Sequence, residues 1–241
     1  MILYGRNPVR EALRGRRASE VKEVWATAGA AREPWLAGVE VQTVAADEVE
    51  RRCGSEAHQG LCAEAGPYRY VSADELLAEE APLLVALDQV QDPQNLGSIC
   101  RTAECAGAAG VVIPERRAAE ITPAVCKASA GAVEHLPVAR VRNLADFLAD
   151  ARKAGCWCYG ASAADDDGQE RASVAYDAPD YRGSGVVLVL GSEGSGLRPR
   201  VAGACDELVA LPLLGRIESL GVSAAAAAIL YEILQSRSRR S

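Results

Sequence analysis

Two polar residues, Asn95 and Arg101, occupy a segment that otherwise reads as an amphipathic helix. In "DPQNLGSICRTAECAG", residues 92–107, Leu96 and Ile99 belong to an apolar stripe at helical spacing, and Asn95 and Arg101 lie off that stripe. An amide and a guanidinium at the start of a helix can hydrogen-bond a substrate. Periodicity alone also allows Asn95 to be the helix N-cap and Arg101 to be a surface charge.

A glycine-rich loop follows an apolar strand in "VLVLGSEGSGLRP", residues 187–199. Gly191, Gly194 and Gly196 allow close approach of a ligand to the backbone. Their G-x-x-G-x-G spacing is neither the G-x-G-x-x-G of dinucleotide-binding folds nor a P-loop. Because the carboxylate of Glu193 would repel a pyrophosphate, the loop favours a neutral or cationic ligand. S-adenosylmethionine, a sulfonium, is one such candidate.

A third irregular segment, "LPLLGRIESLGVSAAAAA", covers residues 211–228. Pro212 and Gly215 predict a loop, which leads into an alanine-rich helix that Ser219 or Ser223 can cap. The simpler interpretation is a tightly packed C-terminal helix. In open parallel sheets, ligands bind at the carboxyl ends of strands, which is where these three segments are expected.

The elements that must position these segments divide into two groups. We predict a domain over residues 1–66, a linker over 67–82, where Gly66 at its border, Pro67, an acidic run and Pro82 interrupt the pattern, and a larger domain over 83–241. In the first domain, Asn7 and Pro8 predict the N-cap and first residue of a helix through Leu13. Its other predicted elements are strands at 21–27, 39–45 and 60–65 and a helix at 46–53.

The larger domain alternates apolar strands with helices. The predicted strands are 83–90, 110–114, 136–141, 156–162, 186–190 and 207–213, and the predicted helices are 95–106, 123–134, 143–155 and 222–237. This alternation is typical of a parallel sheet covered on both faces.

Composition narrows the class of protein. The formal net charge of −7 argues against a nucleic-acid partner, although residues 6–17 form a strongly basic stretch. The 8 cysteines are scattered through apolar segments, which favours buried reduced thiols over a disulfide scaffold. We expect no metal site; "DDDG" at 165–168 lacks the downstream acidic ligand of a calcium loop and is interpreted as a solvated turn. With no apolar run long enough for a membrane span and no signal-peptide pattern, we expect a cytoplasmic protein.

Taken in order, the three segments resemble the signature motifs of the SpoU (TrmH-like) RNA 2'-O-ribose methyltransferases. "LDQVQDPQNLGSICRTAECAG" is similar to motif one, "LVLGSEGSGL" to motif two and "LPLLGRIESLGVSAAAAAILYE" to motif three. The resemblance covers residues 83–236. In addition, "YGRNPVREAL" and "HQGLCAEA" are similar to the small ribosomal-protein-like, RNA-binding domain of the subgroup that methylates a guanosine in 23S ribosomal RNA.

The resemblance implies an α/β fold whose C-terminal part forms a trefoil knot, although chains rarely thread loops. It implies a homodimer, ribosomal RNA as substrate and S-adenosylmethionine as cofactor. By similarity, the cofactor pocket includes Gly191, Glu193, Gly194, Leu211, Leu213, Ser219 and Leu220. The basic helix implies RNA contacts by Arg6, Arg10 and Arg14.

The family's catalytic positions correspond to Asn95, Arg101, Glu193 and Ser219. Because an arginine with a pKa above about 12 is a poor base, Arg101 is expected to orient the 2'-hydroxyl and stabilise the developing alkoxide. Glu193 is expected to hold Asn95 or the loop. One position departs from the pattern: the family has Ser-Leu-Asn-Val-Ser in motif three, and here Gly221 replaces the asparagine.

Three alternatives stay open at the sequence level. The same chemistry on transfer RNA fits the motifs equally well. The loss of the motif-three asparagine allows a noncatalytic RNA-binding relative that retains cofactor binding. A nicotinamide-dependent oxidoreductase is disfavoured by the glycine spacing and by Glu193.

Overall fold

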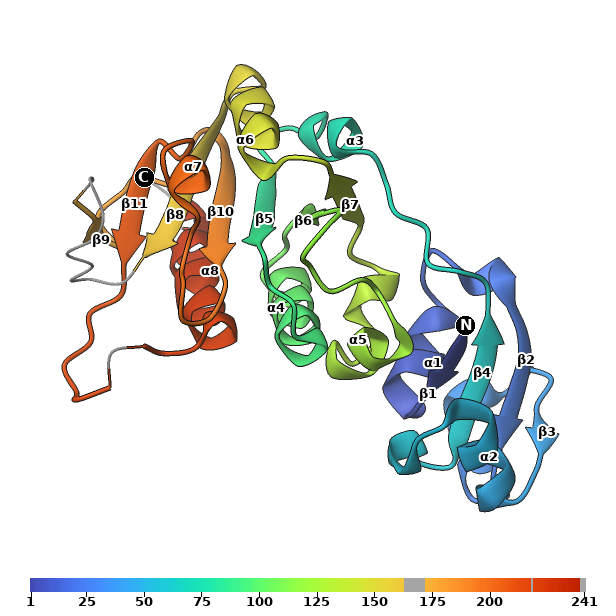
Figure 1. Cartoon of the computed structure of the whole chain (residues 1–241). Coiled ribbons are helices and arrows are strands. Elements are labelled where there is room, and N and C mark those ends of the chain that lie inside the picture. The colour runs from blue at the N-terminus through green and yellow to red at the C-terminus, as the bar shows by residue number, and fades with distance from the viewer. Residues whose placement is uncertain (163–171, 218, 239–241) are drawn as a thin grey trace.

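A computed structural model of the chain describes residues 1–162, 172–217 and 219–238, so the "DDDG" turn lies outside the described residues. The chain forms two sheets (Figure 1). A 4-stranded sheet with the order β1-β4-β2-β3 belongs to the N-terminal domain, and a 7-stranded sheet with the order β7-β6-β5-β10-β8-β11-β9 belongs to the larger domain.

The N-terminal domain pairs its first and last strands. Its elements are β1 (Ile2–Tyr4), α1 (Arg6–Ala12), β2 (Val21–Ala26), β3 (Gln42–Thr43), α2 (Ala46–Cys53) and β4 (Leu61–Ala65). Strand β4 is antiparallel to both β1 and β2, while β3 pairs parallel to β2. The predicted N-cap at Asn7 is wrong: α1 begins at Arg6 after Gly5, and Pro8 lies within the first turn, where its missing N–H costs no helical hydrogen bond.

Every strand pair of the larger sheet is parallel, as the sequence pattern predicted. The strands are β5 (Leu83–Asp88), β6 (Gly110–Pro114), β7 (Val138–Val141), β8 (Cys156–Ser162), β9 (Val174–Ala175), β10 (Gly185–Gly191) and β11 (Glu207–Ala210). The helices are α4 (Pro93–Cys105), α5 (Pro123–Ala128), α6 (Leu144–Lys153), α7 (Pro199–Ala202) and α8 (Val222–Ser238). Strand β9 and helix α7 were not predicted.

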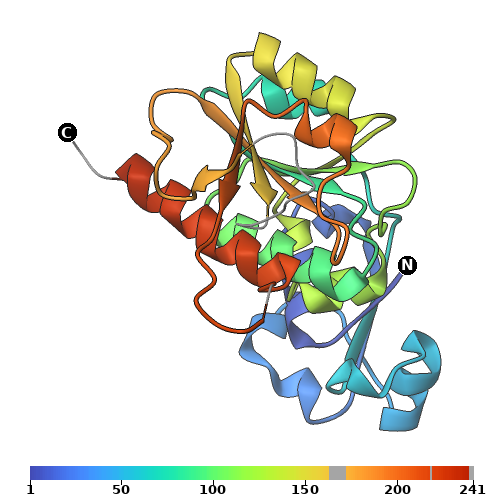
Figure 2. The same cartoon turned by 60° about the vertical axis from the view of Figure 1, so that its left-hand side comes forward.

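The central strands bury both of their faces. Along β5, Val85 and Leu87 pack into the cluster that contains α4 and α8, whereas Leu84 and Ala86 pack into the cluster that contains α6 and α7. Helix α8 lies along one face of the sheet and packs against α4 (Figure 2). This two-sided burial explains why these strands are continuously apolar.

Two helices differ from their predicted extents because of local backbone chemistry. Helix α4 starts at Pro93, since Asp92 is the N-cap and its Oδ1 accepts a hydrogen bond from the Gln94 N–H at 2.9 Å. Asn95 is therefore not the N-cap. The helix predicted over 123–134 ends at Ala128, and a short 3-10 turn follows over Ala132–Glu134 because Gly131 has a left-handed φ of 89°.

The segment predicted as a linker contains a short helix. Helix α3 (Ala73–Leu77) begins with a capping box, in which Ser72 accepts a hydrogen bond from the Glu75 N–H and the Glu75 carboxylate accepts one from the Ser72 N–H. The acidic run that suggested an open linker is thus partly the first turn of this helix. Leu76 is buried in the larger domain.

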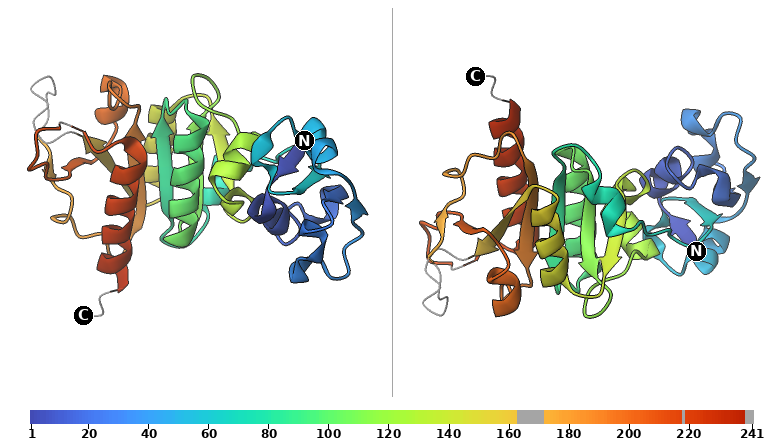
Figure 3. Two further views of the ribbon diagram at one scale, coloured as in Figure 1. Left: turned by 90° about the horizontal axis from the view of Figure 1, so that it is seen from below. Right: turned by 90° about the horizontal axis from the view of Figure 1, so that it is seen from above.

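The N-terminal domain lies at one end of an elongated molecule and the C-terminal elements lie at the other, as two views agree (Figure 3). Its apolar core joins that of the larger domain in one cluster, which includes Leu3 and Val9 together with Val125 and Leu136. The two sheets therefore share one apolar cluster that crosses the boundary between the domains.

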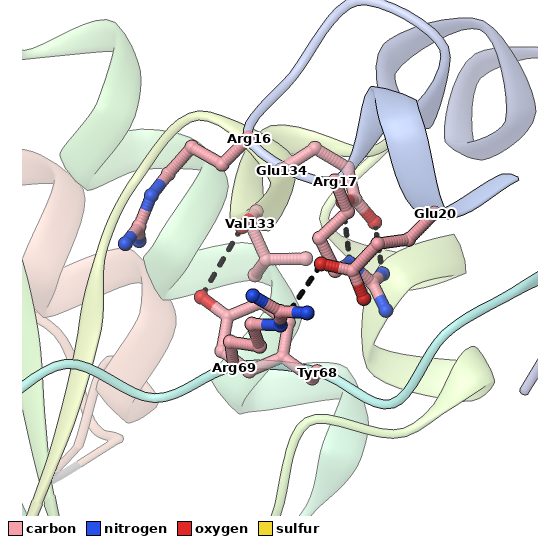
Figure 4. A pocket seen from close by; sticks show the side chains of 7 residues that line it. All are labelled: Arg16, Arg17, Glu20, Tyr68, Arg69, Val133 and Glu134. Atoms are coloured by element: carbon pink, nitrogen blue, oxygen red, sulfur yellow. Dashed lines mark hydrogen bonds and ion pairs between the residues drawn. The ribbon is translucent and has the colours of Figure 1, made fainter.

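A buried ion pair crosses this domain interface (Figure 4). Arg17 Nε donates to Glu134 Oε2 at 3.0 Å, and the two side chains are only 3% and 0% exposed. Burial alone would lower the pKa of Arg17, but the hydrogen bonds and charge of Glu134 raise it. Tyr68 donates to the carbonyl of Val133 at 3.2 Å, and a cavity of about 200 Å³ lies beside these groups.

All eight cysteines are described and none forms a disulfide, and most are buried, as predicted. Burial raises the pKa of the Cys100 and Cys126 thiols to about 12, so both are neutral and unreactive near pH 7. Cys105 differs because it is exposed. Within the described residues, no helix is long and apolar enough to cross a membrane.

Candidate active site at the strand ends

The three segments singled out in the sequence all follow the carboxyl ends of strands, so they leave the larger sheet on the same side. Strands β5 and β10 are parallel neighbours, and Asp88 at the end of β5 lies opposite Gly191 at the end of β10. The segment leading to α4 and the glycine-rich loop therefore begin side by side. Strand β11 leads into the third segment from the same edge, because it is parallel to β8 and β8 is parallel to β10.

Asn95 and Arg101 are carried by α4. Asn95 is in the first turn and half-buried, while Arg101 is exposed. Within the part of the chain that the structure describes, neither side chain has a hydrogen bond or ion pair. Gly97 brings α4 against α5 closely, since a Cβ there would lie 2.4 Å from Ala128 Cβ. The helix is thus fixed by packing, and its two functional candidates keep their donors available.

The sequence analysis missed a buried carboxylate, Asp88, that ties two of these segments together. Asp88 is 0% exposed, and its oxygens accept from the backbone N–H of Arg198 at 2.9 Å and from Arg198 Nε at 2.8 Å. A buried carboxylate requires such partners. The pair joins the end of β5 to the end of the glycine-rich loop. An aspartate that directly ends a buried strand was the available signal.

The glycine-rich loop folds back on itself as a tight hairpin. Ser192 N–H donates to the Gly196 carbonyl at 3.1 Å, and Gly196 N–H donates to the Ser192 carbonyl at 3.0 Å. A Cβ on Gly191 would lie 2.1 Å from the Gly196 carbonyl carbon, so only glycine fits at that position. On the outer side, a Cβ added at Gly194 or Gly196 would meet no atom within 4 Å.

The third segment leaves most of its backbone unbonded. In the described part of the chain, no backbone hydrogen bond involves residues 212–217. Leu214, Ile217 and Leu220 are 97%, 75% and 52% exposed, which is unusual for large apolar side chains. Leu211 and Leu213 are half-buried, and Ser219 is exposed. Unpaired main-chain groups beside exposed apolar side chains can accept an amphipathic ligand.

Glu193 and Gly221 are the residues at which the second and third segments lie near each other. An ideal Cβ on Gly221 would lie 3.7 Å from Glu193 Oε1, which is ordinary van der Waals contact. Gly221 has φ 77°, and its carbonyl accepts the first helical hydrogen bond of α8 from the Ala225 N–H at 3.0 Å. The helix-capping role predicted for Ser219 or Ser223 is therefore taken by Gly221. No hydrogen bond joins Glu193 to Asn95 within the described residues.

The three arginines predicted to bind RNA differ in how free they are. Arg6 pairs with Glu33 at 2.8 Å, and Arg10 pairs with Glu11 at 2.6 Å. Arg14 is exposed, and its guanidinium has no partner among the described residues. Helix α1 also packs against α5, so one side of this basic helix faces the larger domain.

The chemistry available at the strand ends is hydrogen bonding and charge. Asn95 offers an amide, Arg101 a permanent cation, Glu193 a carboxylate and Ser219 a hydroxyl. Among the described residues, no group of three or more His, Cys, Asp or Glu side chains is arranged to hold a metal ion. His58, by contrast, serves the backbone, since its Nδ1 accepts a hydrogen bond from the Gly60 N–H at 2.8 Å.

Comparison with known proteins places the two halves of the chain in one context. The sequence profile of the SpoU rRNA Methylase family matches residues 82–231. A second profile, described as RNA 2'-O ribose methyltransferase substrate binding, matches residues 2–71. Together they include both sheets of the fold.

Individual relatives agree with these matches. A tRNA/rRNA methyltransferase of Synechocystis, named as uncharacterized, is 39% identical over 251 residues; the match covers 98% of this chain, which spans 62% of the length of that relative. A putative TrmH family tRNA/rRNA methyltransferase of Staphylococcus haemolyticus is 34% identical, and the match covers 98% of this chain and 96% of that one. The structure of the AdoMet-bound rRNA methyltransferase from Sinorhizobium meliloti has a TM-score of 0.78 and 28% identity, covering 97% of this chain and 86% of that one.

Proposed function

Because the chain belongs to the SpoU rRNA methylase family, we propose that this RNA methyltransferase moves a methyl group from S-adenosylmethionine to the 2'-hydroxyl of a ribose. The match of residues 2–71 to a substrate-binding domain of RNA 2'-O ribose methyltransferases supports the choice of the ribose hydroxyl. The AdoMet in the Sinorhizobium meliloti neighbour supports the cofactor. One observation of the fold carries the proposal: the end of β5, the glycine-rich loop and the start of α8 lie close together at the carboxyl ends of the strands.

The residues at this edge fit S-adenosylmethionine. The outer side of the hairpin at Gly194 is open, the backbone of residues 212–217 forms no backbone hydrogen bond with any described residue, and exposed leucines border it. The residues we assign to the cofactor are Gly191, Glu193, Gly194, Leu211, Leu213, Ser219 and Leu220. Main-chain groups can pair with adenosine, and the Glu193 carboxylate favours a cationic sulfonium over a pyrophosphate. When bound, this cofactor supplies an electrophilic methyl group.

The side chains of this chain then align and activate the ribose. Methyl transfer is an in-line displacement, so orientation of the hydroxyl is the main demand. The 2'-oxygen would bond to the methyl carbon as the carbon–sulfur bond breaks, and the hydroxyl proton would pass to solvent; Arg101, which is exposed, donates hydrogen bonds to this oxygen and stabilises its developing negative charge. Asn95, six residues earlier on α4, positions the ribose, while Glu193 braces the loop and Ser219 contributes a hydroxyl to the cofactor site.

We assign RNA binding to residues 1–66 and methyl transfer to residues 83–241, joined by residues 67–82. A guanosine in 23S ribosomal RNA is the proposed target, supported by the resemblance of the N-terminal domain to that subgroup. Arg6, Arg10 and Arg14 are the proposed phosphate contacts there, with Arg14 already free to bind. Transfer RNA is the second candidate, because the related proteins are named as tRNA/rRNA methyltransferases.

Assembly completes the proposal. We assign a homodimer to this chain, supported by the exposed apolar side chains Trp157 and Tyr231 at 52% and 43% exposure. We also assign a trefoil knot to the segment between β10 and α8. Its support is that the glycine-rich loop and the segment before α8 lie near each other at Glu193 and Gly221.

The first experiment measures transfer of labelled methyl from S-adenosylmethionine to unmodified transcripts of 23S ribosomal RNA and, separately, to unmodified transfer RNA. Nucleoside analysis then identifies the methylated product. Label in 2'-O-methylguanosine of 23S RNA is the expected result. Label in a methylated base would overturn the ribose assignment, and label only in transfer RNA would overturn the substrate.

A noncatalytic RNA-binding role is the competing function, and Gly221 is the observation that favours it. The family's asparagine at this position would add an amide beside Glu193 that this chain lacks. Calorimetric titration with S-adenosylmethionine separates the two functions. Cofactor binding without label in any RNA would establish the noncatalytic role.

A further inference from the structure

The loop after β6 presents two arginines that the function described so far does not use. We call residues 115–120 the arginine loop; at its apex, Arg116 and Arg117 are both exposed. In the part of the chain that the structure describes, neither guanidinium has a hydrogen bond or an ion pair. Most other arginines in the described structure are paired with a carboxylate, as Arg140, Arg182 and Arg200 are. These two charges are therefore available to a ligand.

The ends of the arginine loop are anchored to the neighbouring strand. The Glu115 N–H donates to the Val141 carbonyl at 2.9 Å. Arg140 Nη2 donates to the Glu115 carbonyl at 3.0 Å and pairs with Glu120 Oε1 at 3.1 Å. The loop is thus held at both ends by one strand, although the Nε of Arg140 is buried without a partner.

Two further hydrogen bonds fix the second half of the loop. The Ala119 N–H donates to the Val90 carbonyl at 2.9 Å, and the Ile121 N–H donates to the Tyr70 hydroxyl at 2.9 Å. With this many anchors, the apex is preorganised, so a ligand that binds it pays little of the usual ordering entropy.

The backbone of Arg117, at the apex of the arginine loop, has an unfavourable conformation. Arg117 has φ 59°, the left-handed region that long L side chains rarely adopt. Such conformations persist where the surroundings impose them, and they cluster at binding sites. Glycine or asparagine would fit this turn with less strain, so the arginine is not explained by the turn itself.

The arginine loop lies next to the proposed site of methyl transfer. Strand β6 is the neighbour of β5, and neighbouring strands are about 4.8 Å apart. The bond from Ala119 to Val90 places the loop against the segment that leads into α4, which carries Asn95 and Arg101. An RNA strand whose ribose reaches Arg101 therefore passes close to the arginine loop.

The surroundings set this loop apart in charge. A groove of about 680 Å³ beside the loop is lined by Asp74, Asp146, Asp150 and the loop's own Glu115, together with Arg140 and Arg142. Arg116 and Arg117 do not line this groove, and on a chain with a net charge of −7 they are two adjacent guanidiniums without a carboxylate partner in the described structure. An arginine fork matches a phosphate bidentately.

We propose that the arginine loop, through Arg116 and Arg117, binds backbone phosphates of the RNA strand beside the methylated nucleotide. This inference rests on the proposed function as an RNA methyltransferase. It assigns substrate positioning to residues that belong to none of the three signature motifs. Phosphate contacts of this kind set register and carry no base specificity.

The test compares wild-type protein with R116A/R117A and with R152A/K153A. The control variant removes Arg152 and Lys153, two adjacent cations at the end of α6. They lie shortly before the start of β8, whereas the arginine loop follows the end of β6, so the two sites are at opposite ends of the parallel strands. Each protein is titrated with 23S ribosomal RNA transcript at several salt concentrations, and S-adenosylmethionine binding and single-turnover methyl transfer are measured in parallel. Sedimentation reports the oligomeric state of each protein.

For R116A/R117A we expect RNA affinity to fall roughly tenfold for each lost contact. The salt slope of log K should fall by about 1 per phosphate contact. Cofactor affinity should be unchanged, and R152A/K153A should match wild type. R117G is expected to be at least as stable as wild type while losing affinity, which separates RNA binding from a role in folding.

Unchanged RNA affinity in R116A/R117A would overturn this inference while wild-type transfer left the proposed function intact. A changed oligomeric state with unchanged affinity would overturn it in favour of a contact between protein chains. Absence of RNA binding and of methyl transfer in the wild type would overturn the proposed function as well.

Discussion

The domain interface and the loops at the strand ends treat their polar groups in opposite ways. At the interface, Arg17 and Glu134 are almost fully buried and satisfy each other. At the strand ends, Asn95 and Arg101 have no hydrogen bond within the described residues, and the backbone of 212–217 is unbonded. Both regions are rich in polar groups. At the interface these groups hydrogen-bond one another in the folded protein, whereas Asn95, Arg101 and the backbone of 212–217 form no such bonds within the described residues.

This difference separates groups that build the protein from groups that are available to a ligand. A buried ion pair must be completed by the fold, because an unpaired buried charge is strongly destabilising. An exposed group left unpaired has little effect on stability and can be completed by substrate or cofactor. Asp88 and Arg198 belong to the first kind although they lie among the second, since they hold the glycine-rich loop in place.

The largest expected effect is on chemistry. Arg101→Ala should lower the rate of methyl transfer by roughly 10² to 10³ or more, because the developing alkoxide loses its cationic partner. Single-turnover transfer to RNA measures the rate, and calorimetric titration should give unchanged affinity for S-adenosylmethionine. A parallel loss of cofactor affinity or thermal stability would instead identify Arg101 as a structural residue and break the comparison.

The second effect is on stability. Glu134→Ala should lower the free energy of unfolding by about 3–5 kcal/mol, because it leaves the Arg17 guanidinium buried and unpaired. Urea unfolding measures the change. The double variant Arg17→Met/Glu134→Leu should recover most of the loss. If Glu134→Ala had the same free energy of unfolding as wild type, the domain interface would tolerate an unpaired polar group as well as the exposed loops do.

A smaller, mixed effect is expected at Asp88. Asp88→Asn should lower the free energy of unfolding by about 1–3 kcal/mol and weaken cofactor binding, because the hydrogen bonds that hold Arg198 are partly lost. Denaturation and calorimetric titration measure the two effects.

Arg200→Ala is the matched control for Asp88→Asn, since it removes the exposed pair of Arg200 with Asp146. Such a surface pair contributes about 0–1 kcal/mol, so stability and cofactor affinity should both stay near those of wild type. Equal effects in the two variants would mean that the buried pair does not position the glycine-rich loop.

The smallest effect is expected at Gly221. Its φ of 77° lies where asparagine is tolerated, and an added Cβ has room beside Glu193. Gly221→Asn should therefore change the free energy of unfolding by no more than about 1 kcal/mol, and methyl transfer should be as fast as in wild type or faster. Stopped assays and thermal melts check both, and a large loss of transfer would show that glycine is required here.

Sequence reasoning located the repetitive elements better than their ends. The buried strands 110–114 and 156–162 and the helix 46–53 agree with the structure, because their apolar spacing is set by the sheet or helix itself. The N-caps predicted at Asn7 and at Ser219 or Ser223 are wrong, because glycine occupies the N-cap position of both helices. Strand β1 was missed because it is short and is defined by its pairing with β4, whereas α3 was missed although its capping box, Ser72 with Glu75, is local.

The site was predictable as three motifs but not as an arrangement. The motifs identified Asn95, Arg101 and Glu193 as site residues. The proximity of Glu193 to Gly221 could be seen only in the structure. Arg17 and Glu134 are 117 residues apart, and nothing in the spacing of either residue indicates its partner. The left-handed φ of Arg117 could not be predicted, because this strain is a property of the backbone and not of the residue pattern.

The continuous core between the two sheets has a consequence for how the chain can be divided. Leu3 and Val9 share one apolar cluster with Val125 and Leu136, so removing the first domain would expose a hydrophobic face on the second. The chain has two domains by architecture, but we expect them to unfold cooperatively, in a single transition on heating. The first domain is therefore not an interchangeable module, because its orientation relative to the larger sheet is fixed by the shared core.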